Sequence, residues 1–367
     1  MKIAQIAPLS ETVPPPAYGG TELVVSLLTD ELVRRGHEVT LFATADSQTL
    51  ATLEPGAKTA LRHSNLSSEE CMIYTQMQLA RVFERADEFD LIHSHVGQDA
   101  FSFADRSTTP TVHTIHGYFP PLSKKLYKQH YDQNFISISE AQQRYIKQLN
   151  YVGTVYNAID IDRYTFNPEP ENPPYLAFLG RMSKCKGPHI AIEIAKRTRI
   201  PLKIAGKIDH SNEKFFHEKI EPLIDGEQII FVGELTSKEK NQFLGGALAT
   251  LFPISWNEPF GLVMIESMIC GTPVIASKRG STPEIIVDGK TGFLCDEDDI
   301  KGMSAGVCRI VEINREDCHR HVTKNFTVKQ MVDGYEQVYE KLLKQSSSKN
   351  ENVFSMMSNA INELSAK

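Results

Sequence analysis

The chain has 367 residues, which is enough for two domains of about 150 residues, each with its own hydrophobic core. Hydrophobic residues make up 41% and charged residues 23%, which is typical of a globular protein and excludes a disordered or fibrous one. The formal net charge of -7 repels a phosphate backbone, so nucleic acid is not an expected partner.

The cysteines and apolar runs indicate the compartment. The six cysteines include no C-x-x-C pair, which fits neither a zinc site nor a disulfide framework and predicts a reducing compartment, the cytoplasm. The first apolar run is interrupted by Gln5 and ends at Pro8, so it is too short for a signal peptide. No run reaches the ~18 apolar residues of a membrane span.

Short β-branched runs alternate with helical patterns along the chain, and this alternation predicts an α/β fold with parallel sheets. In the first half, a helix is expected over residues 23–33, where leucine and valine recur at steps of three and four before Gly36. The strands expected there are Ile3–Ala7, Val39–Ala43, Leu91–Ser94, Thr111–Thr114, Phe135–Ile138 and Val152–Tyr156.

The alternation stops in a proline-rich segment, which predicts a linker at residues 158–174. Strands are then expected at Tyr175–Leu179, Leu202–Ala205, Ile229–Val232, Thr250–Pro253 and Pro273–Ala276. We therefore expect two Rossmann-like, doubly wound domains, residues 1–157 and 175–326, that face a central cleft. Ligands bind such sheets at the carboxyl ends of the strands, so polar motifs at these ends are the candidates for a site.

The segment Asn257–Glu266 joins an expected strand to an expected helix. Pro259 suits a first helical turn, so the free amides of residues 260–262 are expected to face an anion. Glu258 and Glu266 would lie about 12 Å apart along a helix, whereas paired glycosidase carboxylates stand about 5 to 10 Å apart. The spacing predicts a long ligand with hydroxyl groups at both ends and an anion between them, such as a nucleotide sugar. Two surface carboxylates near a helix start are the alternative.

A basic turn, Gly180–Gly187, follows the first expected strand of the second domain. The Arg181 guanidinium can hold phosphate oxygens bidentately, and Lys186 adds a compact positive charge. Together they predict a diphosphate site that needs no metal ion. A solvated surface turn is the alternative.

Two glycines, Gly19 and Gly20, follow the stiff run Pro14–Pro16 in the first domain. Glycine there lets the backbone approach a ligand that a side chain would block; a plain turn is the alternative. The first strand is not followed by G-x-G-x-x-G, which argues against a nicotinamide enzyme.

With these motifs the chain resembles the retaining, GT-B fold glycosyltransferases of glycosyltransferase family 4. The similarity covers nearly the whole length, and the Glu258-x7-Glu266 signature is its specific part. The other matching motifs are Gly19–Glu22, Arg35–Val39, Thr114–Gly117, Asn157–Asp160, Gly271–Val274 and Asp288–Gly292.

The resemblance implies a role for each candidate residue. It implies that Glu258 contacts the transferred sugar, that Glu266 contacts the ribose, and that Arg181 and Lys186 bind the diphosphate. His116 is by the same resemblance the active-site histidine beside the sugar. The implied catalytic set is His116, Glu258, Arg181 and Lys186.

The resemblance also implies that Gly20 approaches the donor from the first domain and that Leu235 lies near the base. A helix over residues 327–345 is expected to return to the first domain. Cys185 departs from the family, which commonly has glutamate there, and this departure bears on the positioning of Lys186. The full expected donor-binding set is Gly19, Gly20, Arg181, Lys186, Leu235, Glu258, Phe260, Gly261, Leu262 and Glu266.

Two patterns resemble metal sites, and we prefer an interpretation without a metal ion for both. His93, His95, His113 and His116 invite a metal site because a His-x-His and a His-x-x-His can converge on one ion. The basic turn already supplies the positive charge, so no metal and no cofactor are expected. The segment Asp160–Asp162 resembles a metal-binding D-x-D, but it falls in the crossover between domains and is interpreted as structural.

Two segments have alternatives that the sequence leaves open. Residues 118–128 combine aromatic residues with three lysines; they are either a solvated surface helix or a contact for an acceptor or for anionic lipid at the inner membrane face. The tail, residues 346–367, has apolar residues at helical spacing and is either a helix packed on the body or a contact for a partner or membrane.

The sequence thus predicts a cytoplasmic, metal-independent transferase that moves a hexose from a nucleoside diphosphate sugar to an acceptor hydroxyl with retention. UDP-glucose is the first expectation for the donor and GDP-mannose the second, on prevalence alone. The alternatives are a nucleotide-sugar epimerase or sugar-phosphate synthase of the same fold, or a non-catalytic nucleotide-sugar-binding subunit.

Overall fold

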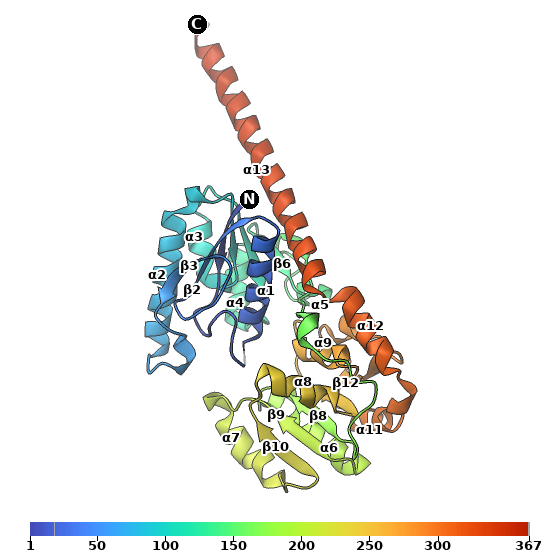
Figure 1. Ribbon diagram of the computed structural model, residues 1–367. Coiled ribbons are helices and arrows are strands. Elements are labelled where there is room, and N and C mark those ends of the chain that lie inside the picture. The colour runs from blue at the N-terminus through green and yellow to red at the C-terminus, as the bar shows by residue number, and fades with distance from the viewer. Residues whose placement is uncertain (18, 366–367) are drawn as a thin grey trace.

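The computed structural model describes residues 1–17 and 19–365, apart from the side chains of His63, Ser237 and residues 347–365. Two parallel β-sheets, each flanked by helices, form the body (Figure 1). The first sheet contains β1 (Lys2–Ile6), β2 (Glu38–Thr44), β3 (Thr52–Ala57), β4 (Leu91–Ser94), β5 (Thr111–Ile115), β6 (Asn134–Ser137) and β7 (Tyr151–Thr154). The second contains β8 (Leu176–Leu179), β9 (Leu202–Ala205), β10 (Ile229–Gly233), β11 (Ala249–Phe252), β12 (Val274–Ser277) and β13 (Gly292–Cys295).

Both sheets are doubly wound. Their strand orders are β3-β2-β1-β4-β5-β6-β7 and β10-β9-β8-β11-β12-β13. The order reverses between β1 and β4 in the first sheet and between β8 and β11 in the second. In a sheet of this kind, the loops that follow the strands at the reversal separate and leave room for a ligand. The fold thus confirms the predicted α/β class and indicates where a site lies in each half.

The helices pack on both sheets and have these bounds: α1 (Gly20–Arg34), α2 (Ser68–Glu84), α3 (Phe101–Ala104), α4 (Pro121–Gln129), α5 (Glu140–Gln143), α6 (Pro188–Thr198), α7 (Glu213–Phe215), α8 (Ser237–Gly245), α9 (Leu262–Ile269), α10 (Thr282–Ile285), α11 (Ile300–Cys308), α12 (Arg315–Asn325) and α13 (Val328–Ser365). The expected helix at residues 23–33 lies within α1. Its Val24, Leu28 and Leu32 are four residues apart and fully buried, which explains the spacing seen in the sequence.

Two strands, β3 and β13, were not predicted. β3 contains Pro55 and Gly56, which lower strand propensity, and its place at the sheet edge is where proline is tolerated. β13 has only four residues and also lies at an edge. Short edge strands carry little periodic signal, because few of their side chains are buried on both faces.

Helix α13 runs alongside the first sheet domain, although the chain reaches it from the second, and then continues beyond the body (Figure 1). Its Val332, Tyr335 and Tyr339 are fully buried in the core that α1 and the first sheet form. The backbone of residues 346–365, in the predicted tail, continues this helix. Residues 366–367 lie outside the described residues.

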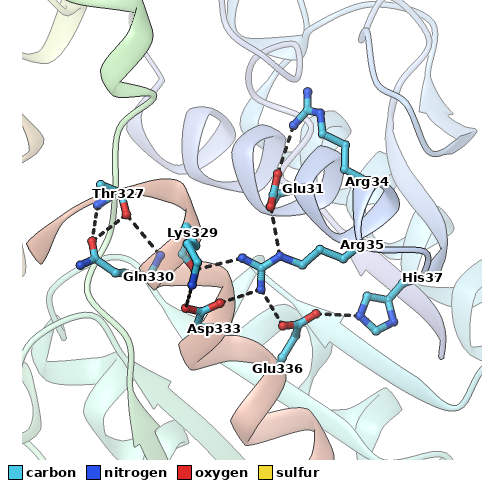
Figure 2. Close-up of polar contacts among 9 residues, drawn as sticks. All are labelled: Glu31, Arg34, Arg35, His37, Thr327, Lys329, Gln330, Asp333 and Glu336. Atoms are coloured by element: carbon cyan, nitrogen blue, oxygen red, sulfur yellow. Dashed lines mark hydrogen bonds and ion pairs between the residues drawn. The ribbon is translucent and has the colours of Figure 1, made fainter. Parts of the chain in front are cut away.

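Polar contacts of Arg35 hold α13 against α1 (Figure 2). Its guanidinium donates to Glu31 at 3.0 Å on α1, and to Asp333 at 2.8 Å and Glu336 at 2.6 Å on α13. The same group donates to the carbonyl of Lys329 at 3.1 Å. Arg35 therefore joins the end of the first helix to the first three turns of the last.

The chain crosses between the two domains twice. Residues 158–174 contain one short 3₁₀ turn, Ile161–Arg163, in which Asp160 Oδ1 accepts from the Asp162 amide at 3.3 Å. Ile159 forms an isolated bridge with Thr327, so both crossings lie side by side. The predicted domain limits at residues 157 and 175 stay predictions.

Candidate active site

A cavity of about 440 Å³ lies between the two sheet domains. Loops that follow strands of both sheets line it, as the strand-order reversals indicate. Every residue of the expected catalytic and donor-binding sets lines this cavity: Gly19, Gly20, His116, Arg181, Lys186, Leu235, Glu258, Phe260, Gly261, Leu262 and Glu266. Residues up to 247 positions apart in the sequence, Gly19 and Glu266, are thus brought together, and their roles stay predictions.

In the second domain, the basic turn and the glutamate motif of the cavity follow β8 and β11, the two strands between which the order reverses. Gly180 and Arg181 come directly after β8, and Glu258 lies in the loop after β11. Because β8 and β11 are paired neighbours, both loops leave the same edge of the sheet. This topology explains why the basic turn meets the glutamate motif.

Glu258 is 8% exposed, and its carboxylate forms an ion pair with Lys186. The Lys186 ammonium donates to Glu258 Oε2, and the Trp256 indole donates to the same oxygen at 3.1 Å. The ammonium also lies 5.0 Å from the centre of the Trp256 ring, within range of a cation–π contact. A buried carboxylate requires such partners, because an unpaired charge is costly to bury.

Glu266 forms a second buried pair of the same kind. It is 4% exposed, and its Oε1 accepts from the ammonium of Lys240 on α8 and from the Tyr164 hydroxyl at 3.0 Å. Burial, followed by the adjacent Glu266 charge, raises the pKa of Tyr164. Sequence reasoning missed Lys240 and Tyr164, because neither falls in a motif and each comes from a different part of the chain.

Arg181 reaches the cavity with a partner that was also missed. Its Nη1 lies 3.7 Å from Oδ2 of Asp209, in the loop after β9, which is the strand next to β8. The side chain of Arg181 keeps 33% of its surface exposed, so the guanidinium can still accept an anion. Cys185, the departure from the family pattern, places its Sγ 3.3 Å from Ser183 Oγ and leaves Lys186 paired with Glu258.

The start of α9 differs from the expectation. Pro259 does not lie in its first turn, because the helix begins at Leu262 with Gly261 as the N-cap at φ 84°. The first-turn amides are therefore those of Leu262 and the two residues after it, and not those of residues 260–262 as expected. Glu258 precedes the helix and Glu266 lies in its second turn, so the pair does not span one continuous helix.

The first domain presents glycines to the same cavity. Gly19 has φ 150°, and a Cβ there would come within 2.7 Å of Pro15 Cβ. Gly20 begins α1, and a Cβ there would lie 3.5 Å from Leu262 on the opposite domain. The backbone of Gly20 thus lies beside the first residue of α9, and both residues line the cavity.

His116 follows β5 and is hydrogen bonded to a second histidine. Its Nε2 lies 2.8 Å from Nδ1 of His95, which follows the neighbouring strand β4. Burial lowers the pKa of His116 to about 4, so its ring is neutral at physiological pH. His93 and His95 point to hydrogen-bond partners in the protein, and His113 is enclosed by Phe101 and Phe135. Among the side chains that the structure describes, no three His, Cys, Asp or Glu residues are grouped to hold a metal ion.

Residues 118–128 include α4 and the rim of the cavity. Tyr118 lines the cavity, and its ring packs edge-on against Trp256 of the other domain with centroids 5.6 Å apart. Leu122, in the first turn of α4, is 77% exposed. No helix among the described residues is long and apolar enough to cross a membrane.

Comparisons with known proteins identify the family. The sequence profile described as Glycosyltransferase Family 4 matches residues 18–163, and the one described as Glycosyl transferases group 1 matches residues 162–326. This chain belongs to glycosyltransferase family 4. The matches meet at the segment where the chain passes from the first domain to the second, so each covers one half of this glycosyltransferase.

Relatives over most of the length agree with this assignment. The D-inositol 3-phosphate glycosyltransferase of Mycolicibacterium smegmatis is 24% identical over 80% of this chain and 79% of its own. The glycogen synthase of Mycobacterium tuberculosis H37Rv is 25% identical over 82% of this chain and 84% of its own.

Solved structures confirm the predicted GT-B fold of this glycosyltransferase. The sucrose-phosphate synthase of Thermosynechococcus elongatus superposes with a TM-score of 0.77 at 19% identity, covering 94% of this chain and 99% of its own. Anabaena HepE in complex with UDP and glucose gives a TM-score of 0.72 at 20% identity, covering 93% and 99%.

Proposed function

We propose that this glycosyltransferase transfers a hexose from a nucleoside diphosphate sugar to an acceptor hydroxyl with retention of the anomeric configuration. One observation carries the proposal: two buried carboxylate–lysine pairs, Glu258–Lys186 and Glu266–Lys240, line one cavity with Arg181. Carboxylates bind sugar hydroxyls and cations bind a diphosphate, so the cavity offers both kinds of partner that a nucleotide sugar needs. The complex of the structural neighbour HepE with UDP and glucose supports this choice of ligand.

In the proposed reaction, the bond between the anomeric carbon and the β-phosphate oxygen breaks as the acceptor oxygen bonds to the same face of that carbon. The proton of the acceptor hydroxyl passes to the departing phosphate oxygen, and the nucleoside diphosphate leaves. Arg181, Lys186 and the first amides of α9 would stabilise the charge that grows on the diphosphate. The proposed steps involve only the two substrates and groups of this chain, and none routes through a metal ion.

Glu258 and Glu266 would have different roles. Glu258 is paired with Lys186, which we propose binds the diphosphate, and this pairing suits a contact of Glu258 with the transferred sugar. Glu266 suits the ribose. We expect Glu258→Gln to lower kcat by about a hundredfold, because its contact strengthens as the sugar becomes positively charged. Glu266→Gln is expected to raise the donor KM about tenfold with little change in kcat.

The test measures release of nucleoside diphosphate by the purified chain from UDP-glucose and GDP-mannose, with water as the acceptor. Glu340→Gln on α13 is the matched control. Release that Glu258→Gln abolishes would support transfer. An isomerised donor would instead identify an epimerase, and binding without turnover would identify a binding subunit. Equal losses of kcat and KM in both glutamate variants would contradict the division of roles.

UDP-glucose is our first expectation for the donor and GDP-mannose the second. A ligand that binds only the folded state raises the unfolding temperature with the logarithm of its concentration over Kd. A thermal-shift series over nucleotide sugars therefore ranks the donors without an acceptor. A larger shift with GDP-mannose would reverse our order.

The acceptor side is proposed to include α4. Lys124, Lys125 and Lys128 follow the cavity residue Tyr118, and Leu122 is exposed beside them. A basic, partly apolar rim suits an anionic acceptor or an anionic lipid surface at the inner membrane face. Triple replacement of these lysines by glutamate is expected to weaken sedimentation with phosphatidylglycerol vesicles. Unchanged sedimentation and acceptor KM would contradict this part of the proposal.

A further inference from the structure

A continuous line of buried hydrogen bonds leads from the cavity to the C-terminal helix. It begins at His116, passes through His95 and Gln5, and reaches Tyr339 of α13, with separations of 2.8, 2.8 and 3.3 Å. From Tyr339 it continues to His93 at 2.6 Å, Thr114 at 2.7 Å and Tyr335 at 3.4 Å. The two tyrosines lie one turn apart on α13. The part of the line that runs from Tyr339 to Tyr335 therefore begins and ends on the same helix.

The chemistry of Gln5 sets the direction of this line. Its carbonyl oxygen only accepts, so Nε2 of His95 carries the proton in the bond to Gln5. Its amide nitrogen only donates, so the Tyr339 oxygen accepts from it. The Tyr339 hydroxyl is then free to donate to His93 Nδ1, and His93 Nε2 to donate to Thr114, which donates to Tyr335. Every bond therefore has one donor, and every donor points away from His116.

The same reasoning assigns the proton of His116. Burial lowers the pKa of His95 well below its ordinary value, so its ring is neutral and carries one proton, on Nε2. Its Nδ1 is then an acceptor, and His116 Nε2 must be the donor in the bond between the rings. A neutral His116 that carries its proton on Nε2 has a lone pair on Nδ1. Within the described chain, no group bonds to that nitrogen, and His116 lines the cavity.

We propose that Gln5, His95 and Tyr339 are positioning residues that hold His116 in the tautomer with the proton on Nε2, leaving Nδ1 to accept a hydrogen bond from a donor-sugar hydroxyl. The C-terminal helix thereby sets the chemistry of a cavity residue that it does not touch. The link to sugar binding rests on the proposed function, whereas the tautomer assignment does not.

Two matched variants test the assignment. Tyr339→Phe removes the acceptor for Gln5, which is then free to rotate and offer its amide to His95, so the proton can shift along the line to His116 Nδ1. Tyr335→Phe removes a hydroxyl of the same kind one turn away, at the terminal acceptor, and leaves all bonds between His116 and Tyr339 in place. Both variants lose one buried hydroxyl, so their general effect on stability is matched.

The measurement is the nitrogen spectrum of ¹⁵N-histidine-labelled protein without ligand at neutral pH. The His116 signals are assigned as those lost in His116→Gln. In the parent and in Tyr335→Phe, we expect His116 Nε2 to be protonated and Nδ1 unprotonated. In Tyr339→Phe, we expect the two nitrogens to move toward each other as both tautomers become populated. A protonated Nδ1 in the parent, or identical spectra of the two variants, would overturn the proposal.

Kinetics supply an independent readout. With any donor that the protein hydrolyses, Tyr339→Phe is expected to lower kcat about tenfold relative to Tyr335→Phe, the loss expected for one hydrogen bond, while donor KM changes less than about twofold. Equal kcat values of the two variants, with unfolding temperatures that also agree, would overturn the link to catalysis. If the parent turns over no donor, the proposed function fails while the spectrum still decides the tautomer.

Discussion

Lys240 compensates the charge of Glu266 in a site where water cannot do so. Replacing Lys240 by Met would leave a carboxylate that is 4% exposed with the Tyr164 hydroxyl as its one remaining hydrogen-bond partner among the described side chains. We expect this change to lower the free energy of unfolding by about 2–3 kcal/mol. Lys238→Met on the same helix changes an exposed lysine and is expected to stay within about 0.5 kcal/mol of the parent. Urea unfolding of the two variants measures the difference; equal midpoints would contradict it.

His113 is 1% exposed, and neither ring nitrogen makes a hydrogen bond of good geometry within the described structure, although the Gln133 side chain lies close enough to raise its pKa slightly against the effect of burial. Burial lowers its pKa to about 3, against 6.5 in an unfolded chain. Below pH 6.5 the unfolded state therefore binds a proton that the folded state does not. The free energy of unfolding falls as the pH is lowered from 6.5 toward the pKa of His113 in the folded state.

His113→Leu removes this dependence along with two unsatisfied nitrogens. Between pH 6 and pH 4, we expect the variant to lose about 1.4 kcal/mol less stability per pH unit than the parent. At pH 7 the two proteins are expected to be of similar stability, because the leucine also removes the cost of burying unpaired polar atoms. Urea unfolding across this pH range is the measurement, and parallel curves would contradict the prediction.

At the scale of elements, the start of α9 depends on one glycine. Gly261 has φ 84°, and a Cβ there would lie 2.8 Å from Met264 Cε, 3.1 Å from Phe252 Cζ and 3.2 Å from Glu258 Cγ. Alanine at this position disfavours the left-handed backbone by about 1–2 kcal/mol and pushes on Glu258. We expect Gly261→Ala to lower the unfolding temperature and weaken donor binding.

Gly117→Ala is the control for this change. Gly117 lines the same cavity, and a Cβ there would meet no atom within 4 Å. Its unfolding temperature is expected to match that of the parent. Thermal unfolding and donor titration of both variants are the measurements. Equal unfolding temperatures and equal donor affinities of Gly261→Ala and Gly117→Ala would contradict the prediction.

For the whole molecule, α13 secures the first domain through Arg35. Its side chain is 19% exposed and joins one carboxylate on α1 to two on α13 (Figure 2). The neighbouring Arg34 is 57% exposed, and its one ion pair within the described part of the chain is with Glu31, at 3.6 Å. Arg35→Met is expected to lower the free energy of unfolding by about 2 kcal/mol, whereas Arg34→Met is expected to have little effect because exposed pairs contribute little.

Hydrogen exchange distinguishes a local loss of stability in these variants from a loss over the whole molecule. Arg35→Met is expected to speed amide exchange over residues 328–343 more than over the second sheet, since the contacts that it removes hold α13 on α1. Uniform exchange across the molecule, or equal effects of the two arginine variants, would contradict this account.

A polar contact between the domains comes from Glu284 of α10. Its carboxylate accepts from the amides of Glu140 and Ala141 at 2.8 and 2.6 Å, at the start of α5 in the first domain. The Tyr156 hydroxyl donates to the same group at 3.0 Å. An acidic side chain at a helix N-terminus is favourable, so the carboxylate stabilises the arrangement of the domains around the cavity.

Local pattern was enough to predict the α/β class, eleven of the strands, and the glutamate motif and basic turn that line the cavity. His116 and Leu235, which also line it, were expected from the family resemblance. Buried strands and an amphipathic helix such as α1 repeat with a fixed period, and the glutamate motif and basic turn are contiguous in the chain. Because such patterns extend over only a few residues, they can be recognised in the sequence without knowledge of the fold. The position of the α9 start was wrong, because Gly261 ends the preceding loop in a conformation that spacing does not reveal.

Only the folded chain joins groups that are remote in sequence. Lys240 finds Glu266, Asp209 finds Arg181, and Tyr339 finds Gln5 across 334 positions. No repeating sequence pattern marks these partners, because each pair forms between two elements that are brought together by sheet order and core packing. The direction of the hydrogen bonds that reach His116 likewise depends on which helix lies behind the first sheet, and that is decided by the return of α13.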